Sequence, residues 1–206
     1  MKQNKFQILI FICCAIHVQV WAQDFPSRMW HEGWLVTSEN DTLKGRVKYN
    51  LENDIVQLLV NNGVVKTYNS KKVIYFEIYD HSIANHRQFY SIPYKVRSNY
   101  NAATFFEVLY EGELTLLVRE KIVIDADPYS NSYYYTGPTP TRERLSYTYF
   151  FVDLQGNMKR YTGKKNELYD ILDKNVEAIK DYVRENNLKL DKMRDLVRIT
   201  AFYNSL

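Results

Sequence analysis

Histidines and nearby carboxylates are the side chains of this sequence best suited to chemistry. His81 and His86 lie five residues apart, and Glu77 and Asp80 precede them closely. Imidazole and carboxylate groups are common zinc ligands and general bases. A spacing of five points two side chains in different directions on a helix or a strand, and the H-E-x-x-H frame of a zinc enzyme is missing. The spacing therefore favours polar residues in a strand connection over a metal site.

A second candidate is the pair Glu107 and Glu113. Glu107 is the one charge inside "TFFEVLY", and Glu113 follows in the next turn. A buried carboxyl group with a raised pKa can serve as a catalytic acid. Strand alternation equally lets Glu107 face water, and like charges opposite each other on paired strands repel. A carboxylate-dependent envelope hydrolase is the alternative function that this pair supports.

Other catalytic groups are missing from the sequence. It contains no G-x-S-x-G elbow and no glycine-rich phosphate loop. Both cysteines, Cys13 and Cys14, lie inside the apolar start of the chain. We therefore expect no catalytic residue, no cofactor and no metal, and we expect the distinctive side chains to build a scaffold. A bound cation, or a tight cluster of ionisable groups shielded from water, would contradict that expectation.

The first residues form the pattern of a secretory signal peptide. Lys2 and Lys5 precede an apolar run, Ile8 to Ile16, and Val20-Trp21-Ala22 supplies a small residue at the cleavage point. The apolar run is shorter than the roughly 20 residues that span a bilayer. The pattern predicts a signal peptide at residues 1–22 and a mature chain without cysteine or transmembrane segment. Its destination would be the periplasm, the outer-membrane periphery or the extracellular space.

Composition limits the class of protein further. Removal of residues 1–22 leaves 184 of the 206 residues, enough for one domain or two small ones. The mature chain keeps 25 of the 27 Lys and Arg residues against 24 Asp and Glu. A net charge this close to zero argues against a nucleic-acid partner.

Alternating apolar and polar residues predict a β-rich body over residues 23–162. The stretch "GWLVTSENDTLKGRVKYN" contains two alternating runs around Glu39-Asn40-Asp41, the signature of a hairpin rather than of a calcium loop. Two more hairpins are expected around Glu111-Gly112-Glu113 and Leu154-Gln155-Gly156-Asn157. Further strands are expected at Ile55–Val60, Val64–Tyr68, Val73–Tyr79 and Gln88–Tyr94, the last one ended by Pro93. Their spacing predicts an antiparallel sheet that is curled, sandwich-like or barrel-like.

Residues 163–206 change to a helical period. Apolar residues recur there at steps of three and four, which predicts two to three helices. Asp173-Lys174-Asn175 would interrupt the first stripe, Asn186-Asn187 would end it, and Asp191 would cap the last helix. The fold class expected is α+β, an antiparallel β-rich body followed by C-terminal helices. The sequence leaves open whether the helices cover the sheet.

One segment follows neither period. Asp125 to Arg144 contains three of the five prolines, and it predicts a long flexible excursion between two strands. Tyr133, Tyr134 and Tyr135 lie within it. Three adjacent aromatic residues could contact a glycan or a partner protein, or they could extend the hairpin and pack on the sheet.

Several motifs together resemble a family of uncharacterised secreted proteins of Gram-negative bacteria. The motifs are "GWLVTSENDTLKGRVKY", "YNSKKVIYFEI" and "TFFEVLYEGELTLL", followed by a helical tail ending "AFYNSL". The resemblance spans the mature chain except the Asp125 to Arg144 excursion. It implies a place in the bacterial envelope, and it brings no activity, ligand or catalytic residue with it.

These patterns together predict an exported, non-enzymatic binding or assembly module of the cell envelope. Its partner would be an envelope protein or a glycan. The sequence leaves the identity of that partner and the oligomeric state open.

Overall fold

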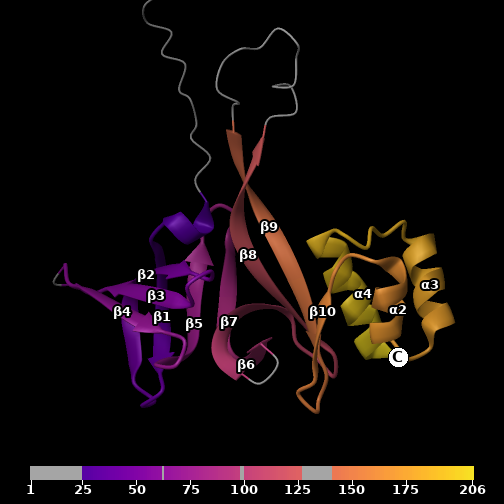
Figure 1. Ribbon diagram of the computed structural model, residues 1–206, viewed down its shortest axis with the longest axis horizontal. Helices are drawn as coiled ribbons and strands as arrows, with labels where there is room; N and C mark the ends of the chain where they lie inside the picture. Colours follow the sequence, from indigo (N-terminus) through magenta and orange to yellow (C-terminus); the bar gives the residue numbers. More distant parts are fainter. Residues whose placement is uncertain (1–24, 62, 98–99, 127–140) are drawn as a thin grey trace, which may run out of the picture.

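A computed structural model describes residues 25–61, 63–97, 100–126 and 141–206. The predicted signal peptide and Tyr133, Tyr134 and Tyr135 lie outside these residues. Within them, ten strands form one antiparallel sheet and three α-helices follow, as predicted for an α+β fold (Figure 1). A short 3-10 helix, η1 (Pro26–Arg28), precedes the sheet. The strands are β1 (His31–Thr37), β2 (Thr42–Asn50), β3 (Ile55–Leu59), β4 (Val65–Asn69), β5 (Val73–Asp80), β6 (Asn85–Arg97), β7 (Tyr100–Tyr110), β8 (Thr115–Ala126), β9 (Thr141–Val152) and β10 (Met158–Tyr161), and the helices are α2 (Lys165–Ile171), α3 (Val176–Glu185) and α4 (Met193–Ser205).

The sheet is curled rather than flat. Its strand order is β10-β9-β8-β7-β6-β5-β1-β2-β3-β4, so β10 and β4 are the edges. Tyr49 on β2 nevertheless hydrogen-bonds Glu120 on β8, although four strands separate β2 from β8 in that order. The sheet must therefore bend until the inner faces of β2 and β8 meet. The bend encloses the apolar side chains of β1, β2, β3, β5, β6 and β7.

The three predicted hairpins are confirmed as β1–β2, β7–β8 and β9–β10. Asn40, in the acidic turn that joins β1 to β2, has a φ of 66°, a left-handed conformation that Asn tolerates. This segment is the hairpin turn that the sequence predicts. Pro93 does not end β6, contrary to expectation. Beyond Tyr90, β6 pairs only with β7, so the missing N–H of Pro93 costs no bond to β5.

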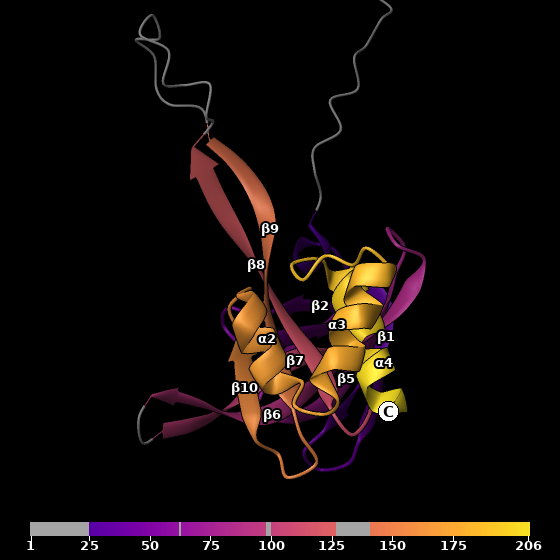
Figure 2. The ribbon, with the colours of Figure 1, turned by 90° about the vertical axis from the view of Figure 1, so that its right-hand side faces the viewer.

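The helices pack on the sheet, a point that the sequence leaves open. Helices α2, α3 and α4 lie together on one side of the sheet (Figure 2). Leu196, Ile199 and Tyr203 of α4 share one apolar core with Leu116 and Phe151 of β8 and β9. The side chain of Asn204 also donates to the carbonyl of Leu114 and accepts from its N–H, at 2.9 Å each. Helix α4 is thus joined to the β7–β8 turn by both packing and hydrogen bonds.

Two of the three helix boundaries predicted from the sequence are confirmed. The stripe is interrupted before Asn175, which has a φ of 40°, and it ends beside Asn187, which has a φ of 51°. The predicted Asp191 cap is wrong. Lys192 occupies the N-cap position of α4 without a side-chain cap, and Asp195 within the first turn accepts from the N–H of Lys189 instead.

Strands β8 and β9 continue beyond the sheet as a two-stranded arm (Figure 1). Strand β7 pairs with β8 only up to Val118, and β10 pairs with β9 only from Tyr149. The arm therefore consists of residues 119–126 and 141–148. The predicted excursion is shorter than expected, because residues 125–126 and 141–144 are strand, and residues 127–140 lie outside the described part. No helix in the described ranges is long and apolar enough to cross a membrane.

Candidate functional site

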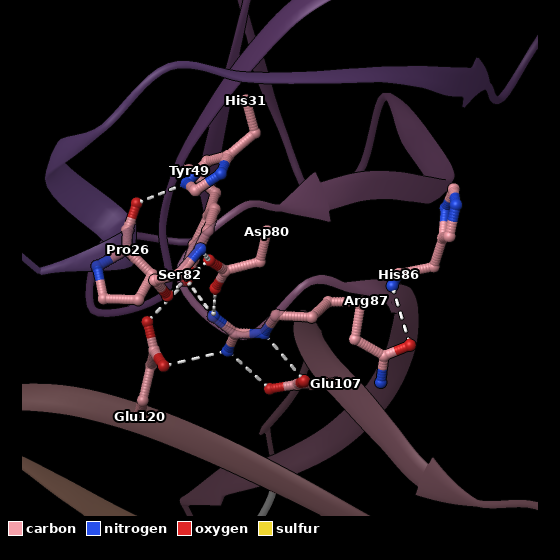
Figure 3. Close-up of polar contacts among 10 residues, drawn as sticks. Pro26, His31, Tyr49, Asp80, Ser82, His86, Arg87, Glu107 and Glu120 are labelled. Atoms are coloured by element: carbon pink, nitrogen blue, oxygen red, sulfur yellow. Dashed lines mark hydrogen bonds and ion pairs between the residues drawn. The ribbon is translucent and has the colours of Figure 1, made fainter.

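A buried arginine binds three carboxylates and a tyrosine inside the curled sheet (Figure 3). Arg87 donates from Nε and Nη2 to the two oxygens of Glu107, at 2.8 and 2.6 Å. Its Nη2 also donates to Glu120 at 2.9 Å, and Nη1 donates to Asp80 at 3.3 Å. We call these four residues, together with Tyr49, the Arg87 cluster. All five are at most 7% exposed.

Tyr49 closes the network. Its hydroxyl accepts from Arg87 Nη1 at 2.8 Å and donates to Glu120 Oε1 at 2.6 Å. On the opposite side, Ser82 donates to Asp80 from both its N–H and its hydroxyl. Buried charges are tolerated only when their donors and acceptors are paired. Every buried side-chain polar atom in the described ranges has a hydrogen-bond partner.

Strand alternation places these side chains on one face. On β6, Arg87 points into the cluster, whereas His86, the residue before it, points away (Figure 3). Phe89 is buried on the same face of β6 as Arg87. On β7, Glu107 has the same orientation as Phe105, and on β8 Glu120 has that of Leu116 and Val118. The cluster therefore takes one residue from each of five strands, β2, β5, β6, β7 and β8.

The cluster changes the acidity of its members. Burial raises the pKa of Glu107, and this outweighs the hydrogen bonds and the charge of Arg87, which act in the opposite direction. Burial also tends to raise the pKa of Asp80, but hydrogen bonds from Ser82 and the charge of Arg87 lower it overall. Burial raises the pKa of the Tyr49 hydroxyl well above its ordinary value. The ionised form of Asp80 is therefore favoured, whereas Glu107 takes up a proton more readily than an ordinary glutamate.

The expectation that no shielded cluster of ionisable groups exists is wrong. Glu107 faces the interior, not water, and both its oxygens bind Arg87. The proposed pair with Glu113 does not form, because Glu113 is exposed and binds Lys174 at 2.5 Å. Arg87, Glu120 and Tyr49 are residues that sequence reasoning missed. Their signal was available, since each alternates in phase with large apolar residues on its own strand.

The histidines lie elsewhere. His86 Nδ1 contacts Glu77 Oε1 at 2.8 Å on the outer face of the sheet. The ring of His81 packs edge-on against that of Tyr79, with 4.8 Å between the ring centroids. Asp80 points inward to Arg87 instead of toward them. Among the described residues, no group of three or more His, Cys, Asp and Glu side chains could hold a metal ion. The geometrically conceivable zinc site of His81 and His86 does not form there.

A cavity of about 530 Å³ opens beside the Arg87 cluster. We call it the arm cavity because η1, β2 and β3 form one side and the β8–β9 arm forms the other. Tyr49 and Glu120 contribute to its wall, and an ion pair of 2.6 Å between Arg28 and Glu143 joins its two sides. Its remaining lining mixes Lys, Glu, Asn and Gln with three isoleucines, Ile55, Ile122 and Ile124.

A second cavity of about 430 Å³, the window cavity, lies where β7 and β8 separate. Glu120 and Lys121 line both cavities, so the two flank the same stretch of β8. Arg119 holds the separation open by binding Asp54 at 2.8 Å and the carbonyl of Phe105 at 2.6 Å. Asp54 also accepts from the N–H of Phe105. This hydrogen bond takes the place of one that a neighbouring strand would make on the edge of β7 that faces β8.

This geometry suits binding better than proton transfer. The carboxylates of Glu107 and Glu120 already accept hydrogen bonds from Arg87 and Tyr49 on each oxygen. A general acid or base needs an oxygen within hydrogen-bond reach of substrate, and Glu107 is only 6% exposed. The cluster instead fixes the shape and the charge of the cavity wall.

Comparison with protein-family models, with curated proteins and with solved structures finds no match to this chain.

Replacing Arg87 by methionine should destabilise the protein strongly. The change leaves three buried carboxylates without their cation, and breaking such a pair costs about 3–5 kcal/mol in unfolding free energy. Urea denaturation followed by far-UV circular dichroism measures this loss. Arg46→Met, on the exposed face of β2, is the control and should change stability by less than about 0.5 kcal/mol. A loss equal to that of the control would show that the cluster does not hold the strands together.

Glu107→Gln should change the pH dependence of stability. Because the folded-state pKa of Glu107 is raised above the ordinary 4.5, the folded protein binds this proton more tightly than the unfolded chain. The wild-type protein should therefore lose stability relative to the variant as pH rises from 4.5 through the raised pKa. Urea denaturation across that range measures the difference, with exposed Glu111→Gln as the control. A difference that stays constant or grows with pH contradicts the assignment.

Proposed function

We propose that this protein is an exported, non-enzymatic binding or assembly module of the bacterial cell envelope, and that the arm cavity receives its partner. The arm cavity is the observation that carries the proposal. It is large enough for part of a peptide or a glycan, and ligand sites are typically concave with a few fixed polar groups. Its charged wall is held in place by the Arg87 cluster, so its shape exists before a partner binds.

The lining favours a partner with both polar and apolar groups. Ile55, Ile122 and Ile124 offer an apolar strip, while Lys48 and Gln57 offer donors and acceptors beside it. Ile124 is 67% exposed on the arm, so its side chain is accessible to a partner in the arm cavity. An envelope protein segment or a glycan has the mixed character that this lining requires.

The hydrolase alternative is less favoured by the same geometry. Glu107 would have to leave the bidentate contact with Arg87 before it could reach a substrate. Glu120 is nearer to the cavity, but Tyr49 and Arg87 occupy one oxygen each. Acid catalysis requires a carboxyl group that exchanges protons with the substrate, and the raised pKa of Glu107 does not meet this need while both its oxygens bind Arg87.

Export is supported by the sequence pattern of residues 1–22 and by the family resemblance. When the full chain is produced in a Gram-negative host, we expect the mature protein to begin at Gln23 and to leave the cytoplasm. Cell fractionation and intact-mass measurement test this. A variant with Lys2→Glu and Lys5→Glu, which removes the positive start, should be processed less. Full-length protein that stays in the cytoplasm would refute export.

The arm cavity is tested by Ile124→Asp. The substitution places a charge on the apolar strip and should abolish retention of partners from a solubilised envelope extract or of soluble peptidoglycan fragments. Because Ile124 is exposed, the fold should be kept. The matched control is Ile83→Asp, which changes a 60% exposed isoleucine in the β5–β6 turn. Equal retention by both variants and the wild-type protein would rule out the arm cavity as the binding site.

A further inference from the structure

The outer face of the sheet, opposite to the Arg87 cluster, carries a row of aromatic rings across three adjacent strands. Trp34 on β1 contacts Tyr75 on β5 at 4.9 Å between ring centroids, and Tyr75 contacts Tyr90 on β6 at 4.6 Å. Tyr75 is 8% exposed because the other two rings flank it, whereas Tyr90 is 37% exposed. The row therefore presents ring surface to solvent from two strands, with Tyr75 fixing the distance between them.

A fixed polar group adjoins these rings. Glu77 lies directly across from Trp34 on β1 and from Gln88 on β6. Its carboxylate accepts from the Tyr75 hydroxyl at 2.5 Å and from Gln88 Nε2 at 3.1 Å, and it contacts His86 Nδ1 at 2.8 Å. Burial opposes ionisation of Glu77, but these three hydrogen bonds lower its pKa overall. The carboxylate is therefore held ionised and in one orientation on an otherwise exposed surface.

The orientation of Glu77 fixes its neighbours in turn. With Nδ1 of His86 directed at Glu77, its Nε2 is left for a further polar contact, as acceptor or donor according to the form of the imidazole, and the amide oxygen of Gln88 remains available as an acceptor. The side chain of His86 is 63% exposed. The surface thus combines aromatic rings with acceptors and an amide at fixed positions, which we call the outer platform.

This combination matches the chemistry of a sugar better than that of an apolar protein surface. A pyranose ring has C–H groups that pack on aromatic faces and hydroxyl groups that need polar partners close by. An apolar protein partner would leave Glu77, His86 and Gln88 buried with their remaining polar atoms unpaired. A polyanion would meet the carboxylate of Glu77 between the rings, and Lys44, across from Trp34 on β2, is a single cation at the edge of the row.

We propose that the outer platform binds a neutral saccharide chain, with Trp34 and Tyr90 as the stacking rings and with Gln88 and His86 as the hydroxyl contacts. This site is separate from the arm cavity. It adds a second surface to the proposed function and assigns a neutral saccharide to that surface.

Titration calorimetry with chitotetraose, cellotetraose and maltotetraose tests the proposal, with tryptophan fluorescence as an independent readout of Trp34. At least one of the three should bind, and Tyr90→Ala should weaken that binding by about tenfold or more. The single variant Trp34→Ala should weaken saccharide binding more than Tyr90→Ala does. Gln88→Leu, on an exposed side chain, should weaken it by about threefold or more without affecting folding.

Tyr147→Ala is the matched control, because Tyr147 is a 39% exposed strand tyrosine on the β8–β9 arm. It should bind the saccharide like the wild-type protein, and so should Ile124→Asp, which changes only the arm cavity. Binding to none of the three saccharides overturns the proposal, and so does equal loss in Tyr90→Ala and Tyr147→Ala. Loss of saccharide binding in Ile124→Asp would place the sugar in the arm cavity and would also overturn it.

Discussion

The burial of a single arginine among carboxylates from different strands is the constraint on which the rest of this structure depends. A guanidinium cannot lose its proton, so Arg87 must be matched by negative charge wherever it is buried. Its planar group satisfies this through Glu107, Glu120 and Asp80 at once. Asp80 and Glu107 lie on β5 and β7, the neighbours of β6, and Glu120 lies one strand further on β8. Tyr49 of β2, which bonds both Arg87 and Glu120, can join them only because the sheet curls. The apolar core of the curled half alone would not specify which strands must meet.

The same constraint explains why cavities lie where they do. Strands β7 and β8 stay paired up to the level of Glu107 and Val118 and then separate, so that Asp54 and Arg119 fill the space between them. The arm continues on its own, and the arm cavity is the room left between it and β2. A cavity bounded by an ion-pair network keeps its shape in the absence of a ligand, which lowers the entropic cost of binding.

Local patterns in the sequence predicted the hairpins, the helix breaks and the α+β class, because turn chemistry and periodicity are short-range properties. They could not predict the Arg87 cluster, whose members are up to 71 residues apart in hydrogen-bonded pairs. Glu107 illustrates the difficulty. Alternation permits it to point inward or outward with equal ease, and only the long-range partner Arg87 decides between the two. The prediction that Pro93 ends a strand was wrong for a similar reason. A strand tolerates proline where the edge that lacks its N–H has no neighbour, and the sequence does not show which edge of β6 is paired.

The hydrogen bonds that join α4 to the β7–β8 turn can form only late in folding. Two of the three hydrogen bonds of the Asn204 side chain reach Leu114, 90 residues earlier in the sequence. The hairpin itself is local and can form early, but its turn acquires these bonds only after the intervening strands and helices have been synthesised. Such distant pairings make folding slow, and they leave the apolar strands β8 and β9 uncovered in the meantime. If the chain is exported as proposed, late docking of the final helix would keep it in an unfolded, transportable state for longer.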